Sequence, residues 1–151
     1  MRPRRTYDYT TLARALSALA ALTLTLAVVP GCTLLGDRTP LDDTSWRLVG
    51  WSVSSIDPGA FTITAQFDNG DIGGTSAVNS YGGEYRTGPG NDFSVGEIAQ
   101  TLMAGPEEDM QAEAVYHDLL RAAASYRLNG TTLTLFDADG NESLVFIAAP
   151  R

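Results

Sequence analysis

The pattern of hydrophobic and polar positions divides the chain of 151 residues into two parts. Residues 15–29 form a run without a charge, rich in alanine and leucine. From Thr44 onward, apolar residues recur at short intervals and are separated by turn-forming residues. An uncharged run of this kind is typical of a targeting segment, whereas short periodic segments are typical of a folded domain. The pattern therefore predicts an N-terminal address followed by one globular domain.

Strict alternation of apolar and polar positions predicts short β-strands in the second part. The clearest is residues 60–68, where every second residue is apolar. Asn69-Gly70 and Asn129-Gly130 are strong hairpin signals. Further strands are expected at residues 44–51, 72–78, 84–87, 92–98, 126–128, 132–137 and 143–147. The last of these is apolar on both faces, which places it in the middle of a sheet or between a sheet and a helix.

One helix is expected, from Pro106 to about residue 125, because proline suits a first helical position and three acidic residues follow it. An apolar stripe at positions 112, 115, 116, 119, 120 and 123 is expected to face the sheet. Glu113, His117 and Arg121 lie four apart, so we expect them on the opposite, solvated face. The predicted fold is mainly β (α+β), an antiparallel barrel-like sheet of about seven or eight short strands with one packed helix.

The N-terminal part has the features of a secretory signal. Arginines at positions 2, 4, 5 and 14 precede the apolar run, which is shorter than the about 20 residues of a membrane-spanning helix. Val29-Pro30-Gly31-Cys32 resembles a bacterial lipobox, which implies diacylglyceryl transfer to Cys32, with palmitate as an acyl chain, and cleavage before it. An ordinary signal peptide with an unrelated cysteine is the alternative. We therefore expect a lipoprotein signal peptide at residues 1–31, a lipidated tether at 32–41 and a domain at 42–151.

Composition narrows the function further. The chain has 10 basic residues, all arginine, and 18 acidic ones, for a net charge of −8, which argues against nucleic acid as a partner. A single cysteine and a single histidine exclude a disulfide framework, cysteine-based zinc sites and paired-histidine sites, and no cofactor is expected. Removal of residues 1–31 would remove four arginines and one acidic residue, Asp8, and would change the net charge from −8 to −11. Anionic lipid repels such a domain, so only the lipid on Cys32 is expected to hold it to the membrane.

Residues 73–85, Gly-Gly-Thr-Ser-Ala-Val-Asn-Ser-Tyr-Gly-Gly-Glu-Tyr, resemble the central motif of the META domain, the HslJ-like family. Residues 44–48 resemble the family's first strand, residues 101–106 its Thr-x-Met-Ala-Cys segment, and residues 126–135 its closing hairpin. The resemblance runs in order from residue 41 to 148. It implies a small β-rich domain with one helix, often lipidated and associated with heat shock, envelope stress and novobiocin tolerance. It carries no catalytic residue.

The chain departs from the family pattern at two places. Ala77-Val78 stands where the family often has cysteine after glycine, and Gly105 stands where it often has the cysteine of Met-Ala-Cys. Because both cysteines are missing together, the resemblance implies that they are neighbours in family members that have them. We therefore expect Val78 to lie near Gly105 in space.

The candidate binding surface consists of Asn79, Tyr81 and Tyr85. Asparagine tolerates left-handed backbone, and tyrosine offers a polar tip on an apolar ring; the alternative is a buried structural corner. His117 could act as a general base, but a solvated pair with Glu113 is favoured. Acidic residues 107–109 suit the helix dipole better than a cation, and residues 137–142 suit a hairpin turn better than calcium. No catalytic or metal-binding residue is assigned.

The leading hypothesis is a lipid-anchored protein on the extracytoplasmic face of the cell membrane. Its domain is expected to be a non-enzymatic binding or interaction module, linked to envelope or heat stress and antibiotic tolerance, with an envelope protein or a small ligand as partner. Two alternatives stay open. One is an inhibitor of a secreted enzyme, acting through an ordered loop at residues 57–60 or 88–91. The other is a small hydrolase using His117 beside a serine or threonine.

Overall fold

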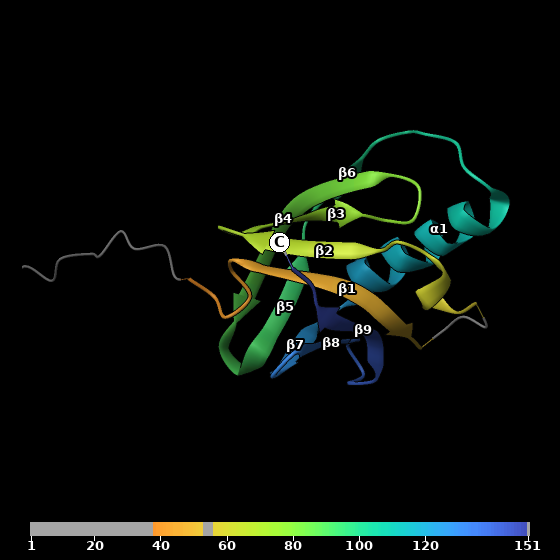
Figure 1. The fold of residues 1–151 in the computed structure, drawn as a ribbon. Helices are drawn as coiled ribbons and strands as arrows, with labels where there is room; N and C mark the ends of the chain where they lie inside the picture. Colours follow the sequence, from red (N-terminus) through yellow and green to blue (C-terminus); the bar gives the residue numbers. More distant parts are fainter. Residues whose placement is uncertain (1–37, 53–55, 151) are drawn as a thin grey trace, which may run out of the picture. The chain divides into compact units, whose positions relative to one another are not determined.

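The computed structural model describes residues 38–52 and 56–150, so the predicted signal peptide and Cys32 lie outside the described residues. The described part contains nine strands, one α-helix and two 3-10 turns (Figure 1). The strands are β1 (Thr44–Trp51), β2 (Thr64–Asp68), β3 (Asp71–Thr75), β4 (Ser80–Gly88), β5 (Asp92–Val95), β6 (Ala99–Gln100), β7 (Ser125–Asn129), β8 (Thr132–Phe136) and β9 (Glu142–Ala148). The helix is α1 (Glu107–Ala122), and the 3-10 turns are η2 (Pro58–Ala60) and η3 (Pro89–Asn91).

The strands form a closed antiparallel barrel. The order is β3-β2-β1-β9-β8-β7-β5-β4, and β3 also pairs with β4, which closes eight strands into a ring. Strand β6 adds to β4 beside the ring. The closure is thinnest between β5 and β7, where Asp92 pairs with Ser125 and the Phe93 amide donates to the Ala124 carbonyl at 2.9 Å. The predicted fold class, a mainly β barrel-like sheet with one packed helix, is confirmed.

Alternation explains the core of the barrel. On β2 and just before it, Ile63, Ala65 and Phe67 point inward and are fully or almost fully buried. Strand β9 lies between β1 and β8, and its Phe146 ring contacts Tyr116 of α1 at a centroid distance of 6.4 Å. The expected position of the last strand is in the middle of a sheet or between a sheet and a helix; β9 lies in mid-sheet, and one of its faces contacts the helix.

The glycine-rich motif lets neighbouring backbones approach closely. A Cβ atom on Gly74 of β3 would lie 2.2 Å from the Thr64 carbonyl oxygen, and one on Gly83 of β4 would lie 2.6 Å from the Glu97 carbonyl oxygen. Real Cβ atoms do not come so near to backbone atoms, so any side chain at either position would push the strands apart. This part of the family motif therefore allows β3 to lie close to Thr64 of β2, and β4 to lie close to Glu97 between β5 and β6.

Several expected strands have different ends: the one expected at 84–87 begins at Ser80, and the one expected at 92–98 ends at Val95. The strand expected at 60–68 begins at Thr64, because Pro58–Ala60 forms a 3-10 turn closed by Asp57, whose side chain accepts from the Gly59 amide at 2.8 Å. The strand expected at 72–78 stops at Thr75, because Ala77 adopts a positive φ of 76° and turns the chain toward β4. That backbone conformation is rare for a residue with a Cβ atom.

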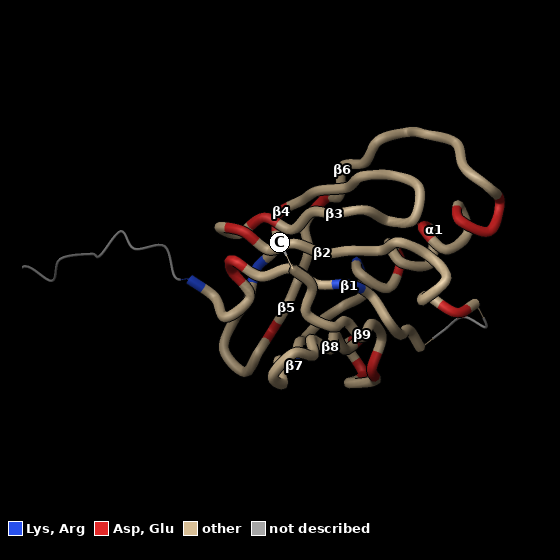
Figure 2. The backbone as a smooth tube through the Cα atoms, viewed as in Figure 1, with Lys and Arg blue, Asp and Glu red and all other residues tan. Residues whose placement is uncertain are grey.

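Helix α1 lies at one end of the barrel (Figure 1), and acidic residues 107–109 mark its exposed start (Figure 2). Its position agrees with the predicted helix, and Ala112, Tyr116, Leu120 and Ala123 of the expected apolar stripe are buried. The buried residues are Ala112, Glu113, Tyr116, His117 and Leu120. Glu113 and His117, expected on the solvated face, face inward instead, because Glu113 finds hydrogen-bond partners inside the protein. Over the described residues, no helix has the length and apolar character needed to span a membrane.

Candidate functional site

The three residues expected to share one binding surface are buried and lie at different ends of the barrel. Tyr81 and Tyr85 both point inward from β4, but they are four positions apart, about 13 Å along a strand. Asn79 precedes β4 beside the helix, and the exposed fractions of the three residues are 1%, 6% and 3% in chain order. The expectation of one shared surface therefore needs correction, because Asn79 and Tyr81 belong to the helix end of the barrel and Tyr85 to the opposite, open end.

A buried carboxylate organises the helix end. Glu113 accepts hydrogen bonds from the Asn79 amide (2.8 Å), the Asn79 side chain (2.9 Å) and the Ser76 hydroxyl (2.8 Å). Burial alone would raise the pKa of Glu113, but these hydrogen bonds outweigh it and hold the pKa below its ordinary value. Glu113 is therefore ionised at neutral pH, and donors from one turn compensate its charge. We call Ser76, Asn79 and Glu113 the helix-end network.

The other end of the Asn79 side chain fixes the β6–α1 loop, residues 101–106. Its Oδ1 accepts from the Thr101 hydroxyl at 2.7 Å and from the Met103 amide at 2.8 Å, and its Nδ2 donates to the Met103 carbonyl at 3.3 Å. Gly105 packs on Val78, since a Cβ atom on Gly105 would lie 3.4 Å from the Val78 Cβ. The expected proximity of Val78 and Gly105 is confirmed.

His117 lies in an aromatic enclosure rather than in solvent. Its ring is 5.4 Å from the Tyr81 ring and 5.6 Å from the Tyr116 ring, centroid to centroid. Both ring nitrogens are buried and have no hydrogen-bond partner among the described residues. Burial lowers the pKa of His117 below its ordinary 6.5, so the ring is neutral at pH 7. The tyrosine hydroxyls bond to each other at 2.5 Å, and Tyr81 also bonds to the Thr64 carbonyl at 2.9 Å.

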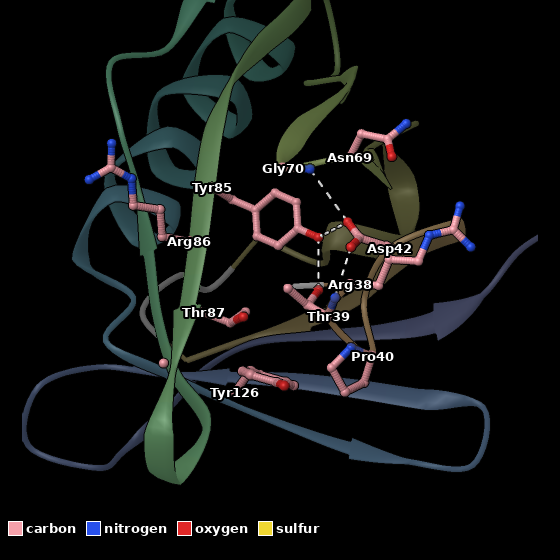
Figure 3. Close-up of a pocket in the computed structure, with 11 residues that line it drawn as sticks. Arg38, Thr39, Pro40, Asp42, Asn69, Gly70, Tyr85, Arg86, Thr87 and Tyr126 are labelled. Atoms are coloured by element: carbon pink, nitrogen blue, oxygen red, sulfur yellow. Dashed lines mark hydrogen bonds between the residues drawn. The ribbon is translucent and has the colours of Figure 1, made fainter. Parts of the chain in front are cut away.

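The open end of the barrel contains a cavity of about 670 Å³ (Figure 3). Its walls come from the segment that enters the barrel, the β2–β3 turn, the end of β4 and β7. The lining residues are Arg38, Thr39, Pro40, Asp42, Asn69, Gly70, Tyr85, Arg86, Thr87, Gly88 and Tyr126. We call this space the open-end cavity.

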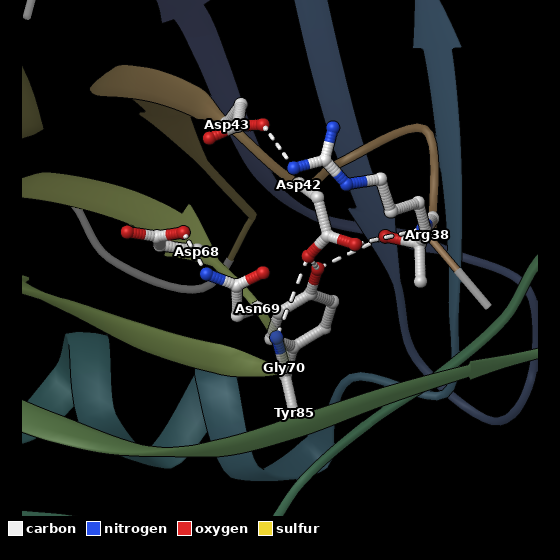
Figure 4. Close-up of polar contacts among 8 residues, drawn as sticks. Arg38, Asp42, Asp43, Asp68, Asn69, Gly70 and Tyr85 are labelled. Atoms are coloured by element: carbon white, nitrogen blue, oxygen red, sulfur yellow. Dashed lines mark hydrogen bonds and ion pairs between the residues drawn. The ribbon is translucent and has the colours of Figure 1, made fainter. Parts of the chain in front are cut away.

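Asp42 ties the walls of the open-end cavity together (Figure 4). Its carboxylate accepts from the Thr39 amide at 2.8 Å, from the Gly70 amide at 3.4 Å and from the Tyr85 hydroxyl. The Tyr85 hydroxyl also lies 2.9 Å from the Thr39 hydroxyl. The bond from Tyr85 lowers the pKa of Asp42, while burial and Asp42 raise the pKa of Tyr85. Asp42 is therefore an acceptor and Tyr85 a donor at neutral pH.

The same contacts place the start of the folded domain before residue 42. Leu41 is fully buried in the core, and Thr39 bonds to Asp42 and Tyr85. The segment expected as a tether, residues 32–41, therefore overlaps the folded domain at its last three residues. The proline and polar residues there resemble a linker, and the contacts that fix them come from β4 and the β2–β3 turn.

The interior of the open-end cavity is aromatic and polar rather than strongly cationic. The rings of Tyr85 and Tyr126 and the Asp42 carboxylate face it, whereas Arg86 leaves β4 on the side opposite Tyr85 (Figure 3). Arg38 pairs with Asp43 at 3.5 Å, at the exposed rim. Such a lining suits a small neutral ligand that has a flat face and hydroxyl or amide groups.

The weaker candidates in the sequence have structural explanations. Asp137 accepts from the amides of Asp139 (3.0 Å) and Asn141 (2.9 Å) and from the Asn141 side chain (3.2 Å), which confirms the hairpin turn. Within residues 38–52 and 56–150, no group of side chains is arranged to hold a metal ion. Of the two loops considered for inhibition, η2 buries Pro58, whereas residues 88–91 form an exposed turn.

Sequence reasoning missed the β6–α1 loop as an exposed feature. Leu102 is 91% and Met103 57% exposed. Apolar residues between a strand and a helix would normally be assigned to the core, so their hydrophobicity gave no sign of exposure. The signal that could have found them is the absence of alternation at residues 101–105, just before Pro106.

Three solved structures share this fold. A protein from Burkholderia xenovorans, solved by NMR, is 28% identical with a TM-score of 0.58, over 74% of this chain and 85% of that one. A second NMR structure is 16% identical with a TM-score of 0.54, over 71% of this chain and 90% of the other. A DUF4847 family protein from Bacteroides vulgatus is 10% identical with a TM-score of 0.56, over 74% and 96%.

The comparison with sequence families gives a more specific result. A search of curated proteins finds no match. The family model for the META domain matches residues 39–150, which covers the whole barrel and begins at the residue that bonds to Asp42 and Tyr85. This chain belongs to the META domain family.

Proposed function

We propose that this chain is a lipoprotein anchored through Cys32, and that its META domain is a non-enzymatic binding module in the cell envelope. The observation that carries the proposal is the open-end cavity, which is about 670 Å³ in volume and is walled by the segment that enters the barrel. This volume falls within the about 300–1,000 Å³ of small-molecule sites. The module is proposed to act in envelope or heat stress and in antibiotic tolerance.

The position of the cavity supports a role at the membrane surface. Arg38 lies on its rim and is the sixth residue after Cys32 along the chain. Six residues span at most about 20 Å, so a lipid on Cys32 would keep the cavity rim within that distance of the bilayer. The acidic domain has no electrostatic attraction for anionic headgroups, so the anchor itself sets this distance.

The surroundings of His117 favour binding over hydrolysis. A general base must reach the proton that it abstracts, whereas the His117 ring nitrogens are enclosed beside Tyr81 and Tyr116. The open-end cavity instead presents tyrosine rings, hydroxyls and a hydrogen-bonded carboxylate, which are groups that orient a ligand. We therefore assign the ligand to the open-end cavity and no catalytic role to His117.

Metabolic labelling with a fatty acid tests the anchor. The parent chain should incorporate label and fractionate with membranes, and Cys32→Ser should lose both properties. Labelling of Cys32→Ser at the parent level would overturn the lipoprotein assignment. A deletion strain should be more sensitive to heat and to novobiocin, and the parent gene should restore tolerance where Cys32→Ser does not.

NMR with neutral aromatic and monosaccharide fragments tests the cavity. Bound fragments should shift the amide signals of Gly70, Thr87 and Gly88. Thr87→Trp places an indole in the cavity and should abolish these shifts, whereas Ser94→Trp, on the exposed side of β5, should retain them. Shifts that survive in Thr87→Trp, or the absence of any fragment that moves these signals, would contradict a ligand site here.

A further inference from the structure

The β6–α1 loop and the first turn of α1 display apolar side chains to solvent. Leu102, Met103 and Met110 are 91%, 57% and 38% exposed, and Ala104 and Pro106 between them are also exposed. Single exposed apolar residues are common on protein surfaces and need no explanation. A group of five on one short segment is different, because contiguous apolar surface marks interaction sites.

The loop is held in one conformation from beneath. Asn79 bonds to the Thr101 hydroxyl and to both the amide and the carbonyl of Met103. Gly105 packs directly on Val78. These contacts fix the conformation in which the Leu102 and Met103 side chains are exposed. Surfaces that are ordered before binding lose less conformational entropy when a partner docks.

The contacts that hold the β6–α1 loop depend on two energetically unfavourable features inside the protein. Burying an ionised carboxylate is unfavourable unless hydrogen bonds replace its hydration. The hydrogen bonds that Glu113 accepts come from Ser76 and Asn79, in the turn between β3 and β4 that bonds to the β6–α1 loop. Ala77 in the same turn has a φ of 76°. A buried charge and a strained residue are thus both used to fix a segment whose apolar side chains face outward.

The acidic residues next to the β6–α1 loop indicate which kind of partner could bind the exposed apolar side chains. Glu107, Glu108 and Asp109 follow it at once and are exposed or half-buried (Figure 2). These carboxylates repel anionic lipid headgroups, and in a symmetric contact they would repel the same residues of a second copy. A protein whose apolar groove is bordered by lysine or arginine would complement both the apolar and the acidic parts of this surface.

We propose that residues 101–106 together with Met110 form a docking site for a second protein that has an apolar groove with a basic rim. Leu102 and Met103 enter the groove, and Glu107, Glu108 and Asp109 pair with the rim. This site is separate from the open-end cavity and lies at the other end of the barrel.

A photo-crosslinking amino acid placed in the full-length chain tests the proposal in cells. Position 102 is compared with position 131, which is exposed in the β7–β8 turn. Position 102 should give one defined protein adduct that position 131 lacks. The partner, identified by mass spectrometry and purified, should bind the parent chain in calorimetry. Leu102→Asp should weaken binding by at least about tenfold, and Thr131→Asp should leave it unchanged.

The acidic residues provide a second, independent readout. Glu107→Gln with Glu108→Gln should slow association and reduce its dependence on salt, because rim charges act mainly on the association rate. Met103→Ser is a second variant in case Leu102→Asp fails to fold, and it should also weaken binding of the partner. Four results would overturn the proposal: adducts to lipid, adducts to a second copy of the chain, no adduct beyond that at position 131, or a purified partner that binds Leu102→Asp as tightly as the parent.

Discussion

The two ends of the barrel, which are joined by β4, differ in where their polar and apolar side chains lie. Tyr81 of β4 lies at the helix end, where the polar groups are buried and apolar side chains face solvent. Tyr85 of β4 points to the open end, where polar groups and aromatic rings line a cavity. The difference shows that one end is organised to present a rigid apolar surface and the other to receive a small ligand. Four variants, two of them with a matched control, test this contrast in decreasing order of expected effect.

Glu113→Gln should have the largest effect because it breaks the helix-end network. A glutamine would turn an amide nitrogen toward donors from Asn79 or Ser76, which leaves buried groups unsatisfied. The free energy of unfolding should fall by about 3 kcal/mol, measured with urea at pH 7.

Glu108→Gln is the matched control, since Glu108 is exposed on the same helix. Its effect should stay within about 0.5 kcal/mol of the parent chain. Equal effects of the two substitutions would show that Glu113 is no more important than a surface charge, and the contrast between the two ends would lose its basis.

Restoring a cysteine pair should stabilise the helix end. The Cβ–Cβ distance of 3.4 Å between Val78 and a side chain at position 105 is close to the about 3.5–4.5 Å of disulfides. In a Cys32→Ser background, oxidised Val78→Cys with Gly105→Cys should raise stability by about 3 kcal/mol, measured by urea unfolding with and without reductant. The double variant should gain nothing when reduced. Failure of the thiols to oxidise would contradict the packing of Gly105 on Val78.

Tyr85→Phe should weaken the open end by a smaller amount, about 1–2 kcal/mol, because the lost hydroxyl bonds to Asp42 and Thr39. The substitution should also raise the pKa of Asp42 toward its ordinary 3.8. A carboxyl whose pKa is lowered by folding stabilises the protein at pH values above its pKa in the unfolded chain. This stabilisation is lost as the pH falls through the pKa of the folded state. Tyr85→Phe should therefore lose less stability than the parent below pH 3.8. Tyr126→Phe, outside the Asp42 network, should keep the parent's acid profile.

His117→Leu should have the smallest effect at neutral pH, a gain of up to about 1 kcal/mol, because leucine buries no unpaired nitrogen. Its clearest signature is in the pH dependence. The pKa of His117 is lowered from 6.5, so below pH 6.5 the unfolded chain takes up a proton more readily and the parent loses stability. His117→Leu should lose less between pH 7 and 5.5. An NMR titration of this single histidine with a pKa at or above 6.5 would contradict its burial.

The barrel could be predicted from the sequence because alternation and turn residues act locally. The strands at residues 44–51 and 132–137 could be predicted from their local sequence patterns alone. The Val78–Gly105 contact was predicted from the family resemblance. The burial of Glu113 and His117 could not be predicted, since such polar residues normally face water. What reverses that preference is a turn 34 residues away along the chain from Glu113. The wall of the open-end cavity was missed for the same reason, because Thr39 and Asp42 bond to Tyr85 of a distant strand.

Hydrogen exchange at the Met103 amide tests the central claim, that buried groups hold an exposed loop in one conformation. Met103 is 57% exposed, yet its amide donates to Asn79 Oδ1 at 2.8 Å. We expect the Met103 amide to exchange at least about 100-fold more slowly than in an unstructured peptide, and to lose this protection in Glu113→Gln. An amide that exchanges at the unstructured rate in the parent chain would show that the loop is not fixed and that its apolar side chains are not presented for docking.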